Sequence, residues 1–165
     1  MRLLAGNASE ALAASMAELL DTPLLERELQ RFPDGEVHVR LHEELRDADT
    51  YVVQSTGPPS QEHLLELFLL ADAAHRAGAA RITAVVPYLA YARQDRRTAV
   101  GDPVGLRVVA DLLHASHVDR LVVIDPHTPA LESIVSVPVE TITAVPLLTD
   151  AVSYTHLTLP TNVNV

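Results

Sequence analysis

The segment from Val86 to Arg97, which reads VPYLAYARQDRR, holds a dense group of side chains suited to chemistry. Its last five positions carry three guanidinium groups, one amide and one carboxylate. The whole chain has a formal net charge of -10, so this local positive charge indicates a site for a phosphorylated ligand. The alternative is a solvated loop whose arginines pair with nearby carboxylates. The segment follows an apolar run of strand length, and ligands of open α/β sheets bind at strand carboxyl ends, which favours the site.

Two further groups have residue types that bind ligands. Asp34, Gly35 and Glu36 combine a flexible backbone position with carboxylates that accept hydrogen bonds from an exocyclic amine. An Asp-Gly pair alone indicates only a turn. His127 directly follows an apolar run, and one imidazole nitrogen can bind a divalent ion. The other histidines lack such a setting and are interpreted as surface, core-edge or tail residues: His38, His42, His63, His75, His114, His117 and His156.

The elements that must position these groups follow from apolar periodicity. Strands are expected at 2–5, 24–30, 36–41, 50–55, 82–86 and 121–124, and helices at 10–20, 61–77 and 102–114. Ser9 is expected to cap the first helix, Gly78 to end the second, and Asp102-Pro103 to open the third. The strands on either side of Pro33-Asp34-Gly35 form a hairpin. The order predicts an α/β layered fold with a mostly parallel central sheet flanked by helices, plus this β-hairpin.

Composition narrows the class of protein. A chain of 165 residues, 48% hydrophobic, has material for one core and one domain. It contains no cysteine, which excludes disulfides and thiol nucleophiles and is compatible with a reducing cytosol. No run approaches the roughly 20 apolar residues of a membrane helix, and a cytoplasmic protein without a membrane partner is expected. The acidic balance and the scarcity of aromatic residues argue against a nucleic-acid partner.

Three segments resemble those of the ribose-phosphate pyrophosphokinases, also called phosphoribosyl pyrophosphate synthetases. PYLAYARQDRR is similar to that family's nucleotide-binding loop, RFPDGE at 31–36 to its adenine-binding hairpin, and VIDPHT at 123–128 to its magnesium-binding strand end. The segments occur in the family's order and spacing. The resemblance extends from about residue 1 to residue 152. It implies that residues 1–152 form the N-terminal, ATP-contacting domain, with a phosphoribosyltransferase-like fold.

The resemblance also implies roles for individual residues. Phe32 would stack near the purine, and Asp34 and Glu36, on either side of Gly35, would contact its edge. Many relatives carry asparagine where Asp34 stands. In the second segment Arg93 and Gln94 would contact ATP, and Asp95 would orient that arginine or its loop. The two further arginines, Arg96 and Arg97, would lie within the family's mobile catalytic flap, with Gly101 as a hinge.

By the same resemblance, His127 would be a ligand of Mg²⁺, while Asp125 would steady its loop or face the water shell of the ion. Mg²⁺ prefers oxygen ligands, so this histidine needs a carboxylate and substrate phosphates beside it. The implied reaction transfers the β,γ-diphosphoryl group of ATP to ribose 5-phosphate, giving phosphoribosyl pyrophosphate and AMP. The implied assembly is a homo-oligomer in which neighbouring subunits share each ATP site.

The family's second domain supplies its ribose-phosphate loop, a metal carboxylate and a catalytic lysine. This chain contains no lysine, and residues 153–165 match nothing expected of the family. We therefore interpret the chain as an N-terminal half, inactive alone, with a foreign or frameshifted tail at 153–165 and the second catalytic domain absent. Two alternatives remain: a non-catalytic homologue that acts as a nucleotide-binding or assembly module, and a type I phosphoribosyltransferase, whose acidic ligand loop the sequence lacks.

Overall fold

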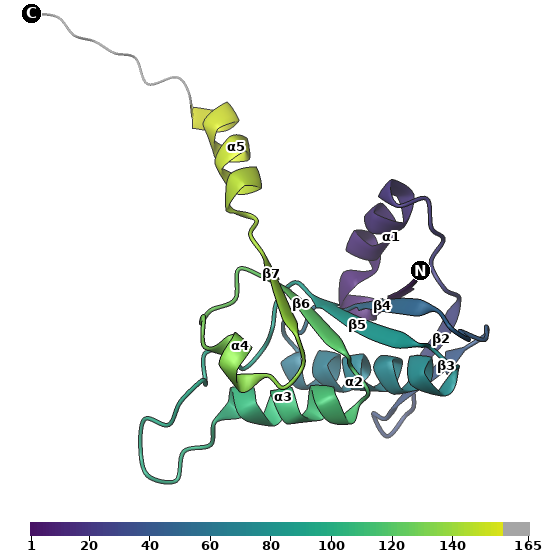
Figure 1. Ribbon diagram of the computed structural model, residues 1–165, viewed down its shortest axis with the longest axis horizontal. Helices are drawn as coiled ribbons and strands as arrows, with labels where there is room; N and C mark the ends of the chain where they lie inside the picture. The colour runs from purple at the N-terminus through teal and green to yellow at the C-terminus, as the bar shows by residue number, and fades with distance from the viewer. Residues whose placement is uncertain (157–165) are drawn as a thin grey trace, which may run out of the picture.

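Residues 1–156 are described by the structure, a computed structural model centred on a five-stranded sheet (Figure 1). The strand order is β1-β4-β5-β6-β7, and all neighbouring strands are parallel. The strands are β1 (Arg2–Ala5), β4 (Asp49–Val53), β5 (Arg81–Val86), β6 (Arg120–Ile124) and β7 (Val139–Ile142). Because every strand runs in the same direction, all five carboxyl ends meet at one edge of the sheet.

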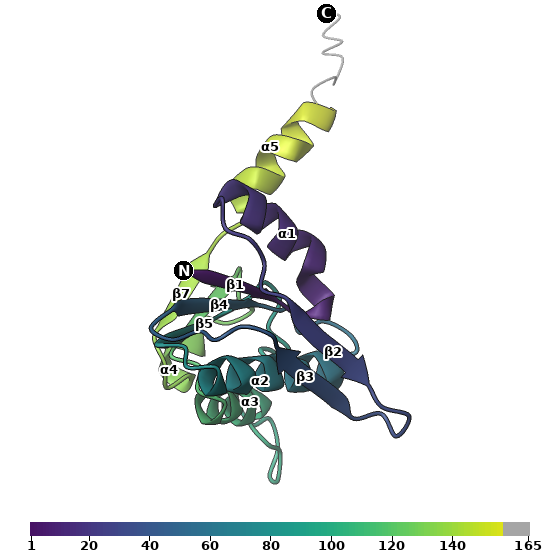
Figure 2. The same cartoon turned by 90° about the vertical axis from the view of Figure 1, so that its right-hand side faces the viewer.

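Helices cover both faces of this sheet. On one face lie α2 (Ser60–Arg76) and α3 (Gly105–Ala115), and on the other lies α1 (Glu10–Leu19), as Figures 1 and 2 show. The 3₁₀ turn η1 (Asn7–Ser9) connects β1 to α1, and the short α4 (Leu131–Ile134) lies between β6 and β7. The last helix, α5 (Val145–His156), projects away from the sheet.

The main core lies between the sheet and α2 and α3. Leu67 and Leu70 of α2 and Leu106 of α3 are completely buried, and the core cluster joins them to Val52 and Ala84 of the sheet. Burial of each such leucine stabilises the fold by about 1.5–3 kcal/mol. The apolar spacing of the two helices therefore fixes which of their faces meets the strands.

A separate antiparallel hairpin extends from the sheet and its covering helices. It consists of β2 (Arg27–Arg31) and β3 (Val37–Leu41), paired so that Leu29 lies opposite Val39. Leu29, Val39 and Leu41 pack against the core, where β3 lies beside α2. The loop between the two strands extends away from the sheet (Figure 2).

The predicted α/β class, parallel sheet and hairpin are confirmed. Gly78 occupies the expected position after α2 with φ +94°, and its N–H donates to the His75 carbonyl oxygen at 2.9 Å. The first strand of the hairpin begins later than predicted, at Arg27, because Leu24 forms an isolated bridge with Leu3 of β1 instead.

Ser9 occupies the predicted N-cap position of α1, but neither Ser9 nor Asp102 caps a helix through its side chain. Ser9 makes no side-chain cap to α1, because its Oγ accepts a hydrogen bond from the Ser55 N–H at 2.8 Å. α3 begins at Gly105 rather than at Asp102-Pro103, because the Asp102 carboxylate is used by the preceding loop, where it accepts from Thr98. In both cases, the polar side chain beside the start of the helix bonds to groups of a loop instead of to the helix N–H groups.

The sequence pattern does not predict α4 or β7. β7 is the outermost strand of the sheet, and three of its four residues are exposed, so it lacks an apolar run. The proposed foreign tail at 153–165 begins inside α5, and its residues 157–165 lie outside the described residues. Within residues 1–156, no helix combines the length and the apolar character that crossing a membrane requires.

Candidate functional site

A pocket of about 190 Å³ opens where β5 and β6 end. Arg93 reaches it from the loop after β5, and His127 from the loop after β6. These two sequence-predicted residues, far apart in the chain, are therefore brought together by adjacent parallel strands. The lining also includes the end of β6 at Val123 and Ile124, and further residues of the two loops, among them Tyr88, Asp125 and Pro126.

Each of the two loops that line this pocket contains a residue with a positive φ angle. Tyr91 has φ +64° and Asp125 has φ +42°, values in the left-handed region that residues other than glycine seldom adopt. Each such residue costs about 1–3 kcal/mol and persists only where surrounding structure holds it, often at functional sites. The pocket is therefore a place where the fold sustains unfavourable backbone geometry.

Hydrogen bonds hold Asp125 in this conformation. Its Oδ1 accepts from the Thr143 hydroxyl at 2.7 Å, and its Oδ2 accepts from the Ala144 N–H at 2.9 Å. These bonds, the hydroxyl first, lower the pKa of Asp125 below its ordinary value. Both of these bonds tie the start of the loop after β6 to the segment after β7.

Asp95 joins the two loops of the pocket. Its Oδ2 accepts from the Thr128 hydroxyl at 2.8 Å, while Arg96 donates to both carboxylate oxygens at 2.9 Å. Arg96 and then Thr128 hold the pKa of Asp95 well below its usual range. Asp95 was expected to orient Arg93 or the loop, and its bonds are to Arg96 in its own loop and to Thr128 in the loop after β6.

The segment after Asp95 forms an extended loop before α3 (Figure 1). Asp102 closes it by accepting from the Thr98 hydroxyl at 2.6 Å and the Ala99 N–H at 2.8 Å. Arg97 is exposed on this loop, and Gly101, the proposed hinge, has φ +91°. Glycine adopts this left-handed conformation without a steric penalty, which permits the tight turn that Asp102 closes.

Gln94 does not line the pocket that contains Arg93 and His127. Its side chain occupies space beside Gly105, where a Cβ would lie 2.5 Å from the Gln94 Oε1. There it lines a separate groove of about 460 Å³ between α2 and α3. Two consecutive predicted site residues therefore face different cavities.

The remaining predicted residues lie at the hairpin tip. Asp34 Oδ1 accepts from the Glu36 N–H at 3.1 Å, and Gly35 has φ +95°. Phe32 is 44% exposed, and its ring centroid lies 5.8 Å from that of His38. Among the described residues, the lining of the 190 Å³ pocket includes none of this tip. One chain thus presents the two predicted halves of the site separately.

Comparison with known proteins identifies the family to which this chain belongs. A family profile described as the N-terminal domain of ribose phosphate pyrophosphokinase matches residues 1–116. The chain belongs to the ribose-phosphate pyrophosphokinase family. Ribose-phosphate pyrophosphokinases of Clostridium tetani and Vibrio parahaemolyticus are similar, at 40% identity over 148 residues and 44% over 149 residues. Each alignment covers 90% of this chain, but 46% and 48% of the respective relative.

A solved structure of the same family agrees with the fold. The phosphoribosylpyrophosphate synthetase of Mycobacterium smegmatis superposes with a TM-score of 0.88 at 37% identity, covering 93% of this chain and 51% of that one. The chain thus spans about half the length of the pyrophosphokinases it matches.

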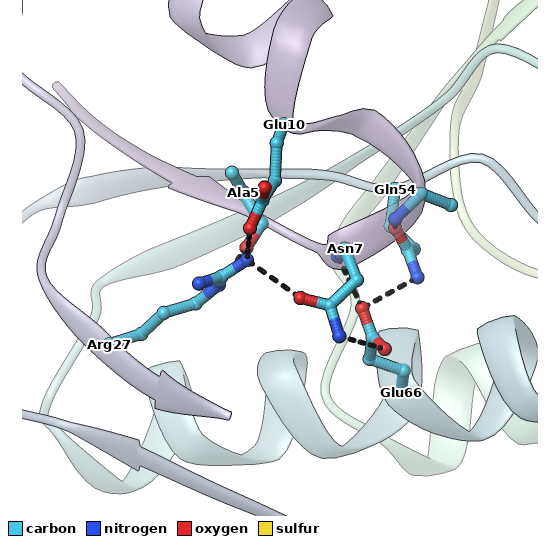
Figure 3. Close-up of polar contacts among 7 residues, drawn as sticks. Ala5, Asn7, Glu10, Arg27, Gln54 and Glu66 are labelled. Atoms are coloured by element: carbon cyan, nitrogen blue, oxygen red, sulfur yellow. Dashed lines mark hydrogen bonds and ion pairs between the residues drawn. The ribbon is translucent and has the colours of Figure 1, made fainter. Parts of the chain in front are cut away.

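Sequence reasoning missed a polar cluster at the neighbouring strand ends (Figure 3). Asn7, Gln54 and Glu66 meet there, and Glu66 is only 5% exposed. One signal was present in the sequence: Glu66 stands on the apolar face of α2, between Leu64 and Leu67, which are both buried. A charged residue on such a face needs polar partners, although the sequence does not say which.

Proposed function

We propose that this chain forms the ATP-contacting part of a ribose-phosphate diphosphokinase, which transfers the β,γ-diphosphoryl group of ATP to the anomeric hydroxyl of ribose 5-phosphate. The meeting of Arg93 and His127 in one pocket carries this proposal. A guanidinium group offers a planar fork of donors that matches phosphate oxygens. The pocket lies at strand carboxyl ends, where α/β sheets bind ligands.

In this proposal the residues of the pocket bind and orient the phosphates. Arg93 donates to the phosphate oxygens, and the Asp95–Thr128 contact keeps the two pocket loops at a fixed separation. Arg96 and Arg97 belong to the loop that would close over the reacting groups and exclude water. Phosphoryl transfer depends mainly on such positioning and charge neutralisation.

The Mg²⁺ of this proposal has one candidate ligand here. His127 is exposed in the pocket, whereas both carboxylate oxygens of Asp125 accept hydrogen bonds within the protein. Within residues 1–156, no three histidine or acidic side chains are close enough to hold a metal ion together. His127 therefore fits as one ligand of an ion that arrives with the nucleotide phosphates, and the ion would neutralise their charge.

The adenine would be contacted by a second copy of this chain. The exposed tip with Phe32, Asp34 and Glu36 lies outside the Arg93–His127 pocket. A homo-oligomer in which each tip reaches the pocket of a neighbour completes the site, and two-fold symmetry would repeat the arrangement.

Mixing two binding-deficient variants tests this arrangement. Arg93→Ala removes the phosphate donor, and Phe32→Ala removes the exposed ring that would stack on the purine. If sites are shared in a dimer, subunit exchange places an intact tip beside an intact pocket in about a quarter of all sites. Calorimetric titration with Mg-ATP should therefore show restored binding in the mixture. Two variants that each fail and never complement, with subunit exchange verified, would exclude a shared site.

A further inference from the structure

The polar cluster of Figure 3 is built around one buried carboxylate. Glu66 Oε1 accepts from the Asn7 N–H at 2.6 Å and from Gln54 Nε2 at 2.8 Å. Its Oε2 accepts from Asn7 Nδ2 at 3.2 Å. All three donors are neutral. A buried carboxylate is tolerated only where such donors are held in place.

Asn7 connects this carboxylate to the base of the hairpin. While its amide nitrogen donates to Glu66, its amide oxygen accepts from Arg27 Nη2 at 3.1 Å. Arg27 is the first residue of β2. The Asn7 amide therefore has one orientation that satisfies both neighbours, with its acceptor toward the cation and its donor toward the carboxylate.

Arg27 also donates hydrogen bonds to two other residues. It donates through Nε to the Ala5 carbonyl oxygen, and through Nη2 to Glu10 Oε1 at 2.8 Å. Its side chain is only 15% exposed. A second ion pair links β2 to a helix of the body, between Arg31 and Glu62, and its side chains are 50% and 47% exposed. Exposed pairs contribute little, so the Arg27 cluster is the stronger fixation of the hairpin.

The cluster also leaves no space for adjustment. A Cβ on Gly6 would lie 2.3 Å from Gln54 Oε1 and 2.9 Å from Glu66 Oε1. Gln54 Oε1 in turn accepts from the Ala8 N–H at 3.1 Å. The turn after β1 is thus packed directly onto the buried carboxylate, and bonds to Glu66 and Arg27 hold the exposed Asn7 in this turn.

We infer that Asn7, Arg27 and Glu66 are positioning residues that set the direction of the hairpin, and through it the placement of Phe32 and Glu36 against the purine. The five paired positions of β2 and β3 transmit the orientation of Arg27 to the tip. The inference rests on the proposed function only in taking the tip as the part that contacts the purine.

Fluorine NMR measures the hairpin directly. Phe32 and Phe68 are the two phenylalanines of the sequence, so 4-fluorophenylalanine labelling gives one reporter at the tip and one beside the core. Arg27→Met should shift and broaden the Phe32 resonance while the Phe68 resonance stays in place. Arg40→Met is the matched control, because it removes an arginine of the same hairpin whose side chain is 62% exposed in its ion pair with Glu28.

A pair exchange separates this positioning role from a general loss of stability. Glu66→Gln alone forces the Asn7 amide to turn, so that its nitrogen faces Arg27. Asn7→Asp alone sets two carboxylates against each other. In the double variant the glutamine donates to the new carboxylate, which still accepts from Arg27, so the Phe32 resonance should return toward its original position. If Glu66→Gln does not fold, the Phe32 resonances of Arg27→Met and Asn7→Asp test the inference instead.

Purine preference is the second measurement. Arg27→Met and Asn7→Asp should lower the ratio of Mg-ATP to Mg-GTP affinity, and the double variant should restore it. Failure of the wild type to bind Mg-ATP would overturn the proposed function, whereas the fluorine measurement would still test the positioning of the hairpin. Single variants whose Phe32 resonance matches that of Arg40→Met, or a double variant that merely adds the two single effects, would overturn the inference.

Discussion

Thr128 donates its hydroxyl hydrogen to Asp95 over 2.8 Å, and this bond connects the loop after β5 with the loop after β6. Arg93 stands two residues before the acceptor, and His127 one residue before the donor. The hydrogen bond between Asp95 and Thr128 thus holds the spacing between Arg93 and His127, although neither of these two residues takes part in it.

Asp95→Asn should destabilise the protein at neutral pH, and progressively less as the pH falls below about 4. Because the folded state lowers the pKa of Asp95, its contribution is fully present above the unfolded pKa of about 3.9 and is lost as the pH falls through the folded pKa. Urea unfolding at pH 7, 5, 4 and 3 should show the difference from wild type shrinking below about pH 4. Asp111→Asn, in an exposed pair with Arg107, is the control. A difference that stays constant with pH would contradict this account.

Arg93→Ala should weaken Mg-ATP binding in the assembled protein. A hydrogen bond to a charged group contributes about 1.5–3 kcal/mol, which corresponds to roughly a 10- to 150-fold loss of affinity. Arg81→Ala is the matched control, since Arg81 lies at the opposite end of β5 in an exposed pair with Asp49. Calorimetry on wild type and both variants gives the comparison, and equal affinities in all three would remove Arg93 from the site.

Glu36→Ala should reduce the preference for ATP over GTP more than it reduces the affinity for ATP. The carboxylate of Glu36 is exposed at the tip, where it can accept from the exocyclic amine of adenine. Competition between Mg-ATP and Mg-GTP measures the ratio. Glu26→Ala, an exposed carboxylate just before β2, should leave the ratio unchanged. A ratio that falls equally in both variants would indicate an effect of charge alone.

Gly6→Ala should destabilise the fold by about 1–3 kcal/mol, the usual cost of overpacking. The added carbon would meet Gln54 Oε1 at 2.3 Å, inside the cluster that holds Glu66. Gly57→Ala offers a control, because the nearest atom to a Cβ there is Tyr88 Cδ1 at 4.0 Å. Urea denaturation of the three proteins checks the order. A Gly6→Ala variant as stable as wild type would show that the cluster can rearrange.

The placement of Arg93 and His127 could be predicted because each follows an apolar run that forms a buried strand. Parallel strands bring such positions to one edge without any knowledge of side-chain contacts. The hairpin tip was predictable for a similar reason, since Pro33-Asp34-Gly35 is a strong local turn signal between two alternating segments.

The contacts between distant segments could not be predicted in this way. Asn7 and Glu66 are 59 positions apart, and neither the turn nor the helix pattern relates them. The direction of Gln94 depends on the space beside Gly105, which only packing reveals. Asp102 looked like a helix cap, but two loop N–H groups and a hydroxyl compete for the same carboxylate.

The hydrogen bonds of Asp125 have a mechanical consequence for the pocket. The residue stands in the pocket lining, yet its carboxylate holds Thr143 and Ala144, the two residues that lead into α5. A load that tilts α5 against the sheet must therefore stretch bonds to a residue already in a strained conformation. The geometry of the pocket lining and the angle of the projecting helix are therefore coupled through Asp125.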